Sequence, residues 1–169
     1  MNYFKRYYWI VLSAVLVGLD QLTKYLVNAY IPQNDAISVI PDFFSLAHVR
    51  NRGAAFGMLK EHRWVFLIFT TIVLVAAFII MFSGKIRSHW GIWAVSLVAS
   101  GGIGHMIDRI FLGEVVDFFA FNFWGYEFAV FNVADIFVCC GVGILAFYIL
   151  FSKDFDSPRK NEESEDESV

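Results

Sequence analysis

The sequence predicts an all-α polytopic membrane protein, in which four transmembrane helices carry a small extracytoplasmic β-sheet and an aromatic interfacial loop. Hydrophobic residues make up 58% of its 169 residues and charged residues only 17%, whereas soluble domains have about 25% charged residues. The mean hydropathy is +0.58. A helix needs about 20 mostly apolar residues to cross the hydrocarbon core, and four stretches qualify: residues 7–27, 64–82, 90–107 and 130–151.

The first predicted span follows two basic residues, as the apolar part of a signal peptide does, but it lacks a small-residue cleavage site. Asp20 and Lys24 continue its helical pattern, so we predict a span that is retained. These two residues are spaced i, i+4 and share one helix face. Mutual neutralisation of this structural polar pair inside the bundle is the favoured interpretation. A catalytic lysine would need a nucleophilic serine nearby, and nothing in the sequence marks one.

Basic residues near the span ends predict the orientation of the helices. The segments before the first span, between the second and third, and after the fourth carry Lys5, Arg6, Lys85, Arg87 and Lys153. These segments and both termini are therefore predicted to be cytoplasmic. Residues 28–63 then lie outside, although they also hold four basic residues, Arg50, Arg52, Lys60 and Arg63.

The two outer segments are predicted to differ in structure. In the first, Ile37 and Val39 alternate with polar neighbours, and residues 44–49 follow a turn that contains proline, which predicts two short strands. The second, residues 113–129, is strongly aromatic, and aromatic rings favour the headgroup level. We interpret it as an interfacial loop that either anchors the protein only or also forms a lid over a site.

Three carboxylates are predicted to meet at the outer face of the membrane. At about 1.5 Å per residue, Asp108 lies at the outer end of the third span, Asp117 follows it, and Asp135 lies one or two turns into the fourth span. A carboxylate at membrane depth is costly, so it usually has a partner or a function. Two close carboxylates share a proton, so one can activate a water while the other protonates a leaving nitrogen. Asp117 and Asp135 are the candidate catalytic pair. The alternative is that Asp135 only hydrogen-bonds within the bundle and that Asp117 is an ordinary interfacial charge.

Further polar residues are candidates for binding or support. Asn51 and Gly53 lie in a stretch of amide and small residues, which permits close approach of a peptide or a helix. Arg109 either clamps substrate carbonyls or a catalytic carboxylate, or belongs to a structural ion-pair network. Asn132 lies three residues before Asp135 on the same helix face, so its amide either orients that carboxylate, or caps the helix or hydrogen-bonds between helices.

The remaining composition excludes several function classes. The four histidines are scattered and form no HExxH motif, so we expect no metal site and no cofactor. The net charge of −3 comes from residues 153–169, which are predicted to form a disordered acidic cytoplasmic tail after a membrane domain at residues 1–152. Because the rest of the chain is almost neutral, we expect no nucleic-acid surface. One chain supplies both carboxylates, so a monomer is expected.

Five motifs, in order along the chain, resemble the lipoprotein signal peptidase (signal peptidase II) family. They are Asp20-Gln21-Leu22-Thr23-Lys24, residues 51–56, residues 104–109, Val115-Val116-Asp117-Phe118 and Phe131-Asn132-Val133-Ala134-Asp135. Each motif is weak alone, but together with four spans they cover the chain from about Tyr7 to Phe151. The resemblance implies a bacterial membrane aspartyl endopeptidase with four spans.

The family resemblance also implies roles for individual residues. Asp117 and Asp135 would be the catalytic pair, and the residues that support or contact the substrate would be Asn51, Asp108, Arg109 and Asn132. The implied substrate is a diacylglyceryl-modified prolipoprotein, cut just before its lipidated cysteine among membrane lipids. The implied location is the bacterial cell membrane, with the active site near the extracytoplasmic face.

His105 departs from the family pattern, which usually has asparagine directly after Gly104. An imidazole can donate one hydrogen bond as the amide does, and it adds a charge below about pH 6.5. We therefore predict a somewhat different pH optimum, which a His105→Asn variant would shift.

Three other functions are considered. A transporter or proton-conducting protein would stagger its acids through the membrane, whereas these gather near one face. A non-catalytic assembly protein would tolerate the loss of Asp117 or Asp135. Another class of intramembrane aspartyl protease would need a Gly-x-Gly-Asp signature, which the sequence lacks.

Overall fold

The computed structural model describes residues 3–53, 63–83, 86 and 88–151. The acidic tail at residues 153–169 and residues 54–56 of the small-residue motif lie outside the described residues. Within the described part the elements, in chain order, are α1 (Tyr3–Tyr30), β1 (Ala36–Ile40), β2 (Phe44–Asn51), α2 (Arg63–Phe82), α3 (His89–Phe111), β3 (Val115–Phe123), β4 (Tyr126–Glu127) and α4 (Val133–Phe151).

The four predicted spans are confirmed as helices that are long and apolar enough to cross a membrane. Their ends differ in detail from the prediction. α1 continues to Tyr30 and α3 to Phe111, while α4 begins only at Val133. The backbone N–H of Leu112 donates to the Asp108 carbonyl at the end of α3, and Asn132 caps the start of α4, so these two ends follow hydrogen bonding and not the change in hydropathy.

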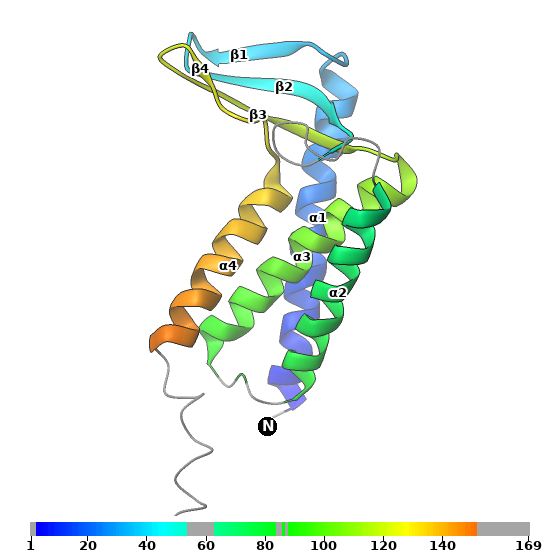
Figure 1. Cartoon of the computed structure of the whole chain (residues 1–169), viewed down its shortest axis with the longest axis vertical. Coiled ribbons are helices and arrows are strands. Elements are labelled where there is room, and N and C mark those ends of the chain that lie inside the picture. The colour runs from blue at the N-terminus through cyan, green and yellow to red at the C-terminus, as the bar shows by residue number, and fades with distance from the viewer. Residues whose placement is uncertain (1–2, 54–62, 84–85, 87, 152–169) are drawn as a thin grey trace, which may run out of the picture.

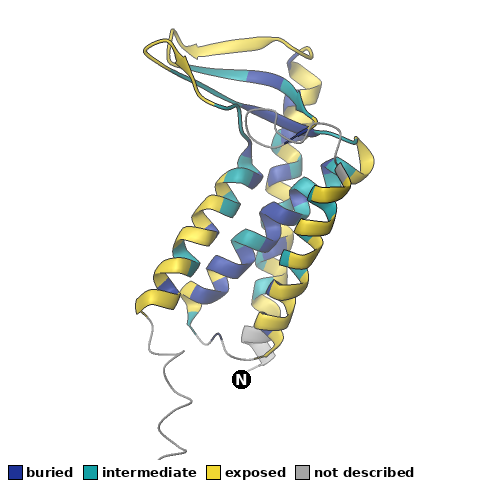
Figure 2. Cartoon of the chain, viewed as in Figure 1, coloured by how far each residue is buried: buried dark blue, intermediate teal, exposed yellow. Residues whose placement is uncertain are grey.

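Helix α3 is the most buried of the four, and it packs against α1, α2 and α4 (Figures 1 and 2). Two glycines bring α3 and α4 close together. An ideal Cβ at Gly101 would lie 2.5 Å from the carbonyl oxygen of Ala134, and one at Gly141 would lie 2.8 Å from that of Ala94. Small residues at such crossings let two helix backbones approach in a membrane. The outward faces of α2 and α4 stay exposed and apolar, as a lipid-facing surface requires.

A four-stranded antiparallel sheet, in the order β1-β2-β3-β4, covers one end of the bundle (Figure 1). The start of α1 and the end of α4 lie at the opposite end of the bundle. Beneath the sheet, Val27 of α1 and Ile31, which directly follows this helix, form a small apolar core with Val116 and Phe118 of β3. This core attaches the sheet to the bundle.

The two strands predicted before the second span are confirmed as β1 and β2. The aromatic segment differs from the predicted loop, because it forms β3 and β4 of the same sheet. Its alternating aromatic side chains suit a strand, and Phe44 of β2 stacks on Phe121 of β3 with ring centroids 4.8 Å apart. The hairpin tip carries Trp124, which is 99% exposed.

Candidate active site

Asp117 and Asp135 line the same cavity of about 210 Å³, where the sheet meets the helices. Its other lining residues come from β2 and the residues that follow it, from α2, α3 and β3: Asn51, Gly53, Phe66, His105, Arg109 and Val115. The structure thus brings together both candidate catalytic aspartates and most of the predicted supporting residues. They come from segments that lie far apart in the sequence.

Strand pairing places Asp117 beside the start of α4. On one side, Asp117 of β3 lies opposite Val49 of β2. On the other, the backbone N–H groups of Phe118 and Phe119 both donate to the carbonyl of Phe131, at 3.0 and 2.8 Å. Since Phe131 directly precedes the first residues of α4, the Asp117 carboxylate lies next to the N-terminus of that helix.

Asn132 joins the two aspartates. Its side-chain Nδ2 donates to Asp117 Oδ1 at 2.6 Å, and its backbone N–H donates to Asp135 Oδ2 at 2.9 Å. In return, Asn132 Oδ1 accepts the backbone N–H of Asp135 at 3.2 Å. This reciprocal pattern is a capping box, in which a residue before the helix and a residue in its first turn satisfy each other's backbone. Asn132 therefore caps α4, as one interpretation held. Its side-chain Nδ2 binds Asp117, and only its backbone N–H binds the Asp135 carboxylate.

Asp117 is the more buried of the two carboxylates. The residue is 3% exposed, whereas the side chain of Asp135 is 40% exposed. Burial, together with a smaller effect of the nearby Asp135 charge, raises the pKa of Asp117 to about 6, against the lowering effect of hydrogen bonds from Asn51 and Asn132. A carboxylate in this state holds a proton over much of the weakly acidic range.

Asn51 and Gly53 form the edge of the cavity on the β2 side. Asn51 Nδ2 donates to Asp117 Oδ2 at 2.9 Å, and Asn51 Oδ1 accepts the backbone N–H of Gly53 at 2.9 Å. Arg109 reaches the same edge from α3, where its Nη2 donates to the Gly53 carbonyl at 3.4 Å. Its guanidinium lies over the ring of Phe66, 4.5 Å from the centroid. The arginine is thus held by a stacking and a backbone contact beside the carboxylates.

His105 contacts the second aspartate directly. Its Nε2 lies 3.1 Å from Asp135 Oδ1, and its side chain is only 15% exposed. Together with the Asn132 N–H on Oδ2, this contact means that both oxygens of Asp135 have a hydrogen-bond partner. The sequence marked His105 as a departure from the family pattern, but it did not show which group the imidazole would meet.

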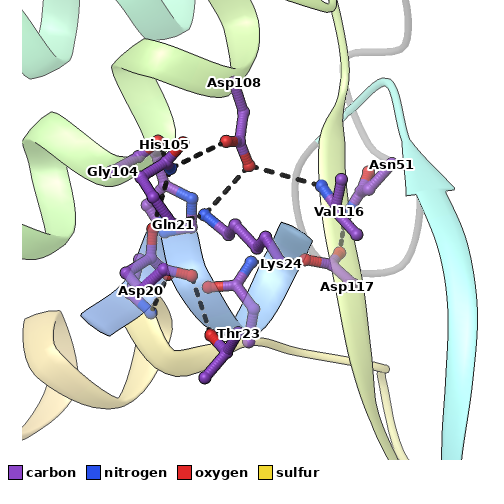
Figure 3. Close-up of polar contacts among 12 residues, drawn as sticks. Asp20, Gln21, Thr23, Lys24, Asn51, Gly104, His105, Asp108, Val116 and Asp117 are labelled. Carbon is purple, nitrogen blue, oxygen red and sulfur yellow. Dashed lines mark hydrogen bonds and ion pairs between the residues drawn. The ribbon is translucent and has the colours of Figure 1, made fainter. Parts of the chain in front are cut away.

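A buried charged cluster lies behind the cavity (Figure 3). Lys24 Nζ lies 2.8 Å from Asp20 Oδ2 and 2.9 Å from Asp108 Oδ2, and all three side chains are almost fully buried. Gln21 Nε2 donates to Asp20 at 3.1 Å and to Asp108 at 3.0 Å. The expected neutralisation of Asp20 by Lys24 is thus present, and Asp108 is a second partner. Gly104 leaves room for the Asp20 carboxylate, which a Cβ there would strike.

This cluster holds the backbone just before each candidate catalytic residue. Asp108 Oδ2 accepts the N–H of Val116 at 3.4 Å, and Asp20 Oδ1 accepts the N–H of Ala134 at 3.0 Å. Lys24 bridges the two acids, so it links the strand that carries Asp117 to the helix that carries Asp135. Asp108, for which the resemblance implied a role in supporting or contacting the substrate, contributes to this link and is not among the residues that line the cavity. Gln21 and Phe66 were not singled out as site residues by the sequence, because neither residue type signals a partner on another helix.

Comparisons with known proteins agree with this architecture. The profile of the family described as Signal peptidase (SPase) II matches residues 12–151. The chain belongs to the signal peptidase II family.

Relatives in the signal peptidase II family are similar over most of their length. The lipoprotein signal peptidase of Syntrophotalea carbinolica is 44% identical over 140 residues, which are 80% of this chain and 86% of that protein. The lipoprotein signal peptidase of Symbiobacterium thermophilum is 43% identical over 141 residues, 83% of this chain and 93% of that protein.

The chain is also similar to a solved structure of a bacterial membrane enzyme, with a TM-score of 0.78 and 34% sequence identity. The match covers 90% of this chain and 92% of the chain of that enzyme. A second solved structure, also described as a bacterial membrane enzyme, has a TM-score of 0.76 and 35% identity, and the match covers 85% of this chain and 93% of that chain. This signal peptidase II chain is therefore a multi-pass bacterial membrane protein and a peptidase.

Proposed function

We propose that the protein is a membrane aspartyl endopeptidase that removes the signal peptide from diacylglyceryl-modified prolipoproteins, cutting just before the lipidated cysteine. The observation that supports this most is the pair formed by Asp117 and Asp135, which line one cavity and share Asn132 as a hydrogen-bond donor. The relatives named as lipoprotein signal peptidases support the substrate class.

In the proposed reaction, one carboxylate removes a proton from a water that attacks the scissile carbonyl. The other carboxylate is protonated, and it donates that proton to the departing nitrogen as the C–N bond breaks. Water supplies the new hydroxyl of the signal-peptide carboxyl group, and the free amine stays on the lipidated cysteine. The raised pKa of Asp117 suits the proton donor.

The residues around the pair have proposed roles in holding the substrate. Asn51 and Arg109 flank the carboxylates, so an amide N–H and a guanidinium are available to substrate carbonyls. Gly53 lines the cavity and has no side chain, so a peptide backbone can approach this edge closely. Because the donors contact backbone groups, the site needs few particular side chains in the substrate.

The membrane geometry fits a substrate anchored by acyl chains. We propose that the sheet end of the bundle is extracytoplasmic and that both chain termini are cytoplasmic, as the basic residues indicate. The cavity then opens near the outer headgroup level, where the lipidated cysteine of a membrane-held precursor lies. Both aspartates come from one chain, so a monomer suffices for catalysis.

Lipid dependence tests the proposed function. We expect the purified protein in detergent micelles to cleave a prolipoprotein that carries the diacylglyceryl group and to leave the same unmodified precursor uncut. The measurement is the intact mass of the products of both reactions over the same time. Equal cleavage of the two precursors would contradict the proposed substrate class, and cleavage of neither would contradict the proposed activity.

The pH dependence follows from the raised pKa of Asp117. We expect kcat/KM to fall as the pH rises through about 6, because free enzyme above that pH loses the proton needed by the leaving nitrogen. The corresponding fall of kcat should occur at a higher pH than that of kcat/KM, since a bound lipidated substrate buries the carboxylates further. Initial rates between pH 4.5 and 8 measure both profiles. A kcat/KM that stays constant across this range would show that Asp117 is not the proton donor.

A further inference from the structure

His105 occupies a position that the catalytic scheme above does not use. It belongs to α3, lines the cavity, and lies 3.1 Å through Nε2 from Asp135 Oδ1. The charged groups on the elements around it are Asp135 of α4, Asp117 of β3, Asp108 and Arg109 of α3, and Asp20 and Lys24 of α1. Of these, Asp135 is the one in direct contact.

We infer that His105 is a positioning residue that donates a hydrogen bond to Asp135, keeps that carboxylate ionised, and so assigns the general base to Asp135 and the shared proton to Asp117. This inference rests on the proposed function, and it deepens it by giving the two aspartates separate roles.

The protonation state of the imidazole follows from its second nitrogen. Nδ1 is buried and has no hydrogen-bond partner among the residues that the structure describes. A proton on Nδ1 would therefore be a buried donor without an acceptor, which costs about 1–3 kcal/mol. A neutral imidazole with its proton on Nε2 leaves Nδ1 as an unpaired acceptor, which proteins tolerate better than an orphaned N–H, and this tautomer donates to Asp135 Oδ1. The alternative, in which a protonated Asp135 donates to Nε2, would place the imidazole proton on Nδ1.

The surroundings of the two aspartates separate their roles. Each carboxylate accepts two hydrogen bonds, so the number of donors alone does not distinguish them. Their exposure does, because Asp117 is 3% exposed and the Asp135 side chain is 40% exposed. Desolvation penalises a charge most at the more buried carboxyl group. The charge therefore resides on Asp135, where the imidazole and the Asn132 N–H both donate to it.

Titration of the carboxyl carbons tests this assignment without any need for proteolysis. The probe is 13Cγ NMR of the protein labelled at aspartate, in detergent micelles, with signals assigned by Asp117→Asn and Asp135→Asn. At about pH 5 we expect the Asp117 signal at the protonated position and the Asp135 signal at the ionised position. In His105→Leu the Asp135 signal should move towards the protonated position, and in His105→Gln it should not, because the glutamine amide replaces the Nε2 donor.

Kinetics on the lipidated precursor provide the second readout. We expect His105→Leu to lower kcat about 10-fold, the size of one hydrogen bond to a charged group, while KM stays within about twofold. The acid limb of its rate profile should move to higher pH, and His105→Gln should restore both rate and limb. His89→Leu, at the far exposed end of the same helix, is the matched control and should match the wild type.

Each outcome decides between the alternatives. An Asp135 that is protonated where Asp117 is ionised would overturn the assignment, as would an Asp135 signal that His105→Leu leaves unchanged. If His105→Gln loses as much activity as His105→Leu without a change in either limb, the imidazole only fills space. A wild-type protein that shows the expected titration but cleaves nothing would contradict the proposed function and support the assignment of the proton.

Discussion

Replacing either Asp117 or Asp135 with asparagine is expected to lower kcat by about 1,000-fold or more while the protein stays folded. An amide can neither remove a proton from water nor supply one to the leaving nitrogen, and general acid–base catalysis contributes about 10²- to 10⁴-fold per group. The amide keeps the size of the side chain and one accepting oxygen, so the contacts to Asn132 are largely retained. The measurement is the initial rate of cleavage of lipidated precursor. The double variant should lose no more than the worse single variant, since the pair acts as one unit.

Asp42→Asn is the matched control for this loss. Asp42 lies in the turn between β1 and β2 on the same side of the bundle, with a φ of 57° that asparagine also tolerates. This variant should retain the wild-type rate. Near-full activity in Asp117→Asn or Asp135→Asn would show that the catalytic carboxylate lies elsewhere.

Replacing Lys24 with methionine is expected to destabilise the protein by about 3 kcal/mol or more. Methionine is similar in length to lysine, but it leaves Asp20 and Asp108 as two buried carboxylates without their shared cation. Removing one partner from a buried ion pair costs about 3–5 kcal/mol. The melting temperature in detergent should fall by roughly 6–12 °C for a chain of this size. Activity should also fall, because both acids hold the backbone next to a catalytic aspartate.

Two further variants separate charge from packing at Lys24. Lys24→Met combined with Asp20→Asn leaves one buried carboxylate in place of two, so part of the lost stability should return. Arg52→Met removes a cation that pairs with Glu114 but is 67% exposed, and it should change stability by less than about 1 kcal/mol. Equal melting temperatures for Lys24→Met and Arg52→Met would contradict the proposed role of the buried cluster.

Hydropathy was enough to predict the four helices, because a membrane span requires a long apolar segment whatever its neighbours are. It was less informative for the segment that became β3. That strand is stabilised by pairing with β2 and by the bridge to Phe131, and such pairing depends on residues far away in the chain. An aromatic run alone does not distinguish a strand from an interfacial loop.

The candidate site was predictable to the extent that depth in the membrane places residues. Matching depths brought Asp117 and Asp135 together, and the structure shows them in one cavity. Depth does not determine the direction in which a side chain points, so it left open whether Asp108 supports the site or contacts the substrate. In the structure the Asp108 carboxylate contacts Lys24. The sequence did not predict the contact of His105 with Asp135 for the same reason, because this contact depends on how α3 packs against α4.

The most direct test of the proposed peptidase is the mass of the products that the wild type and Asp117→Asn release from one lipidated precursor. We expect the wild type to release the intact signal peptide and a protein that begins with the diacylglyceryl-modified cysteine, and we expect Asp117→Asn to leave the precursor whole. A cut at another peptide bond, or the same products from Asp117→Asn, would contradict the proposed cleavage by the Asp117–Asp135 pair.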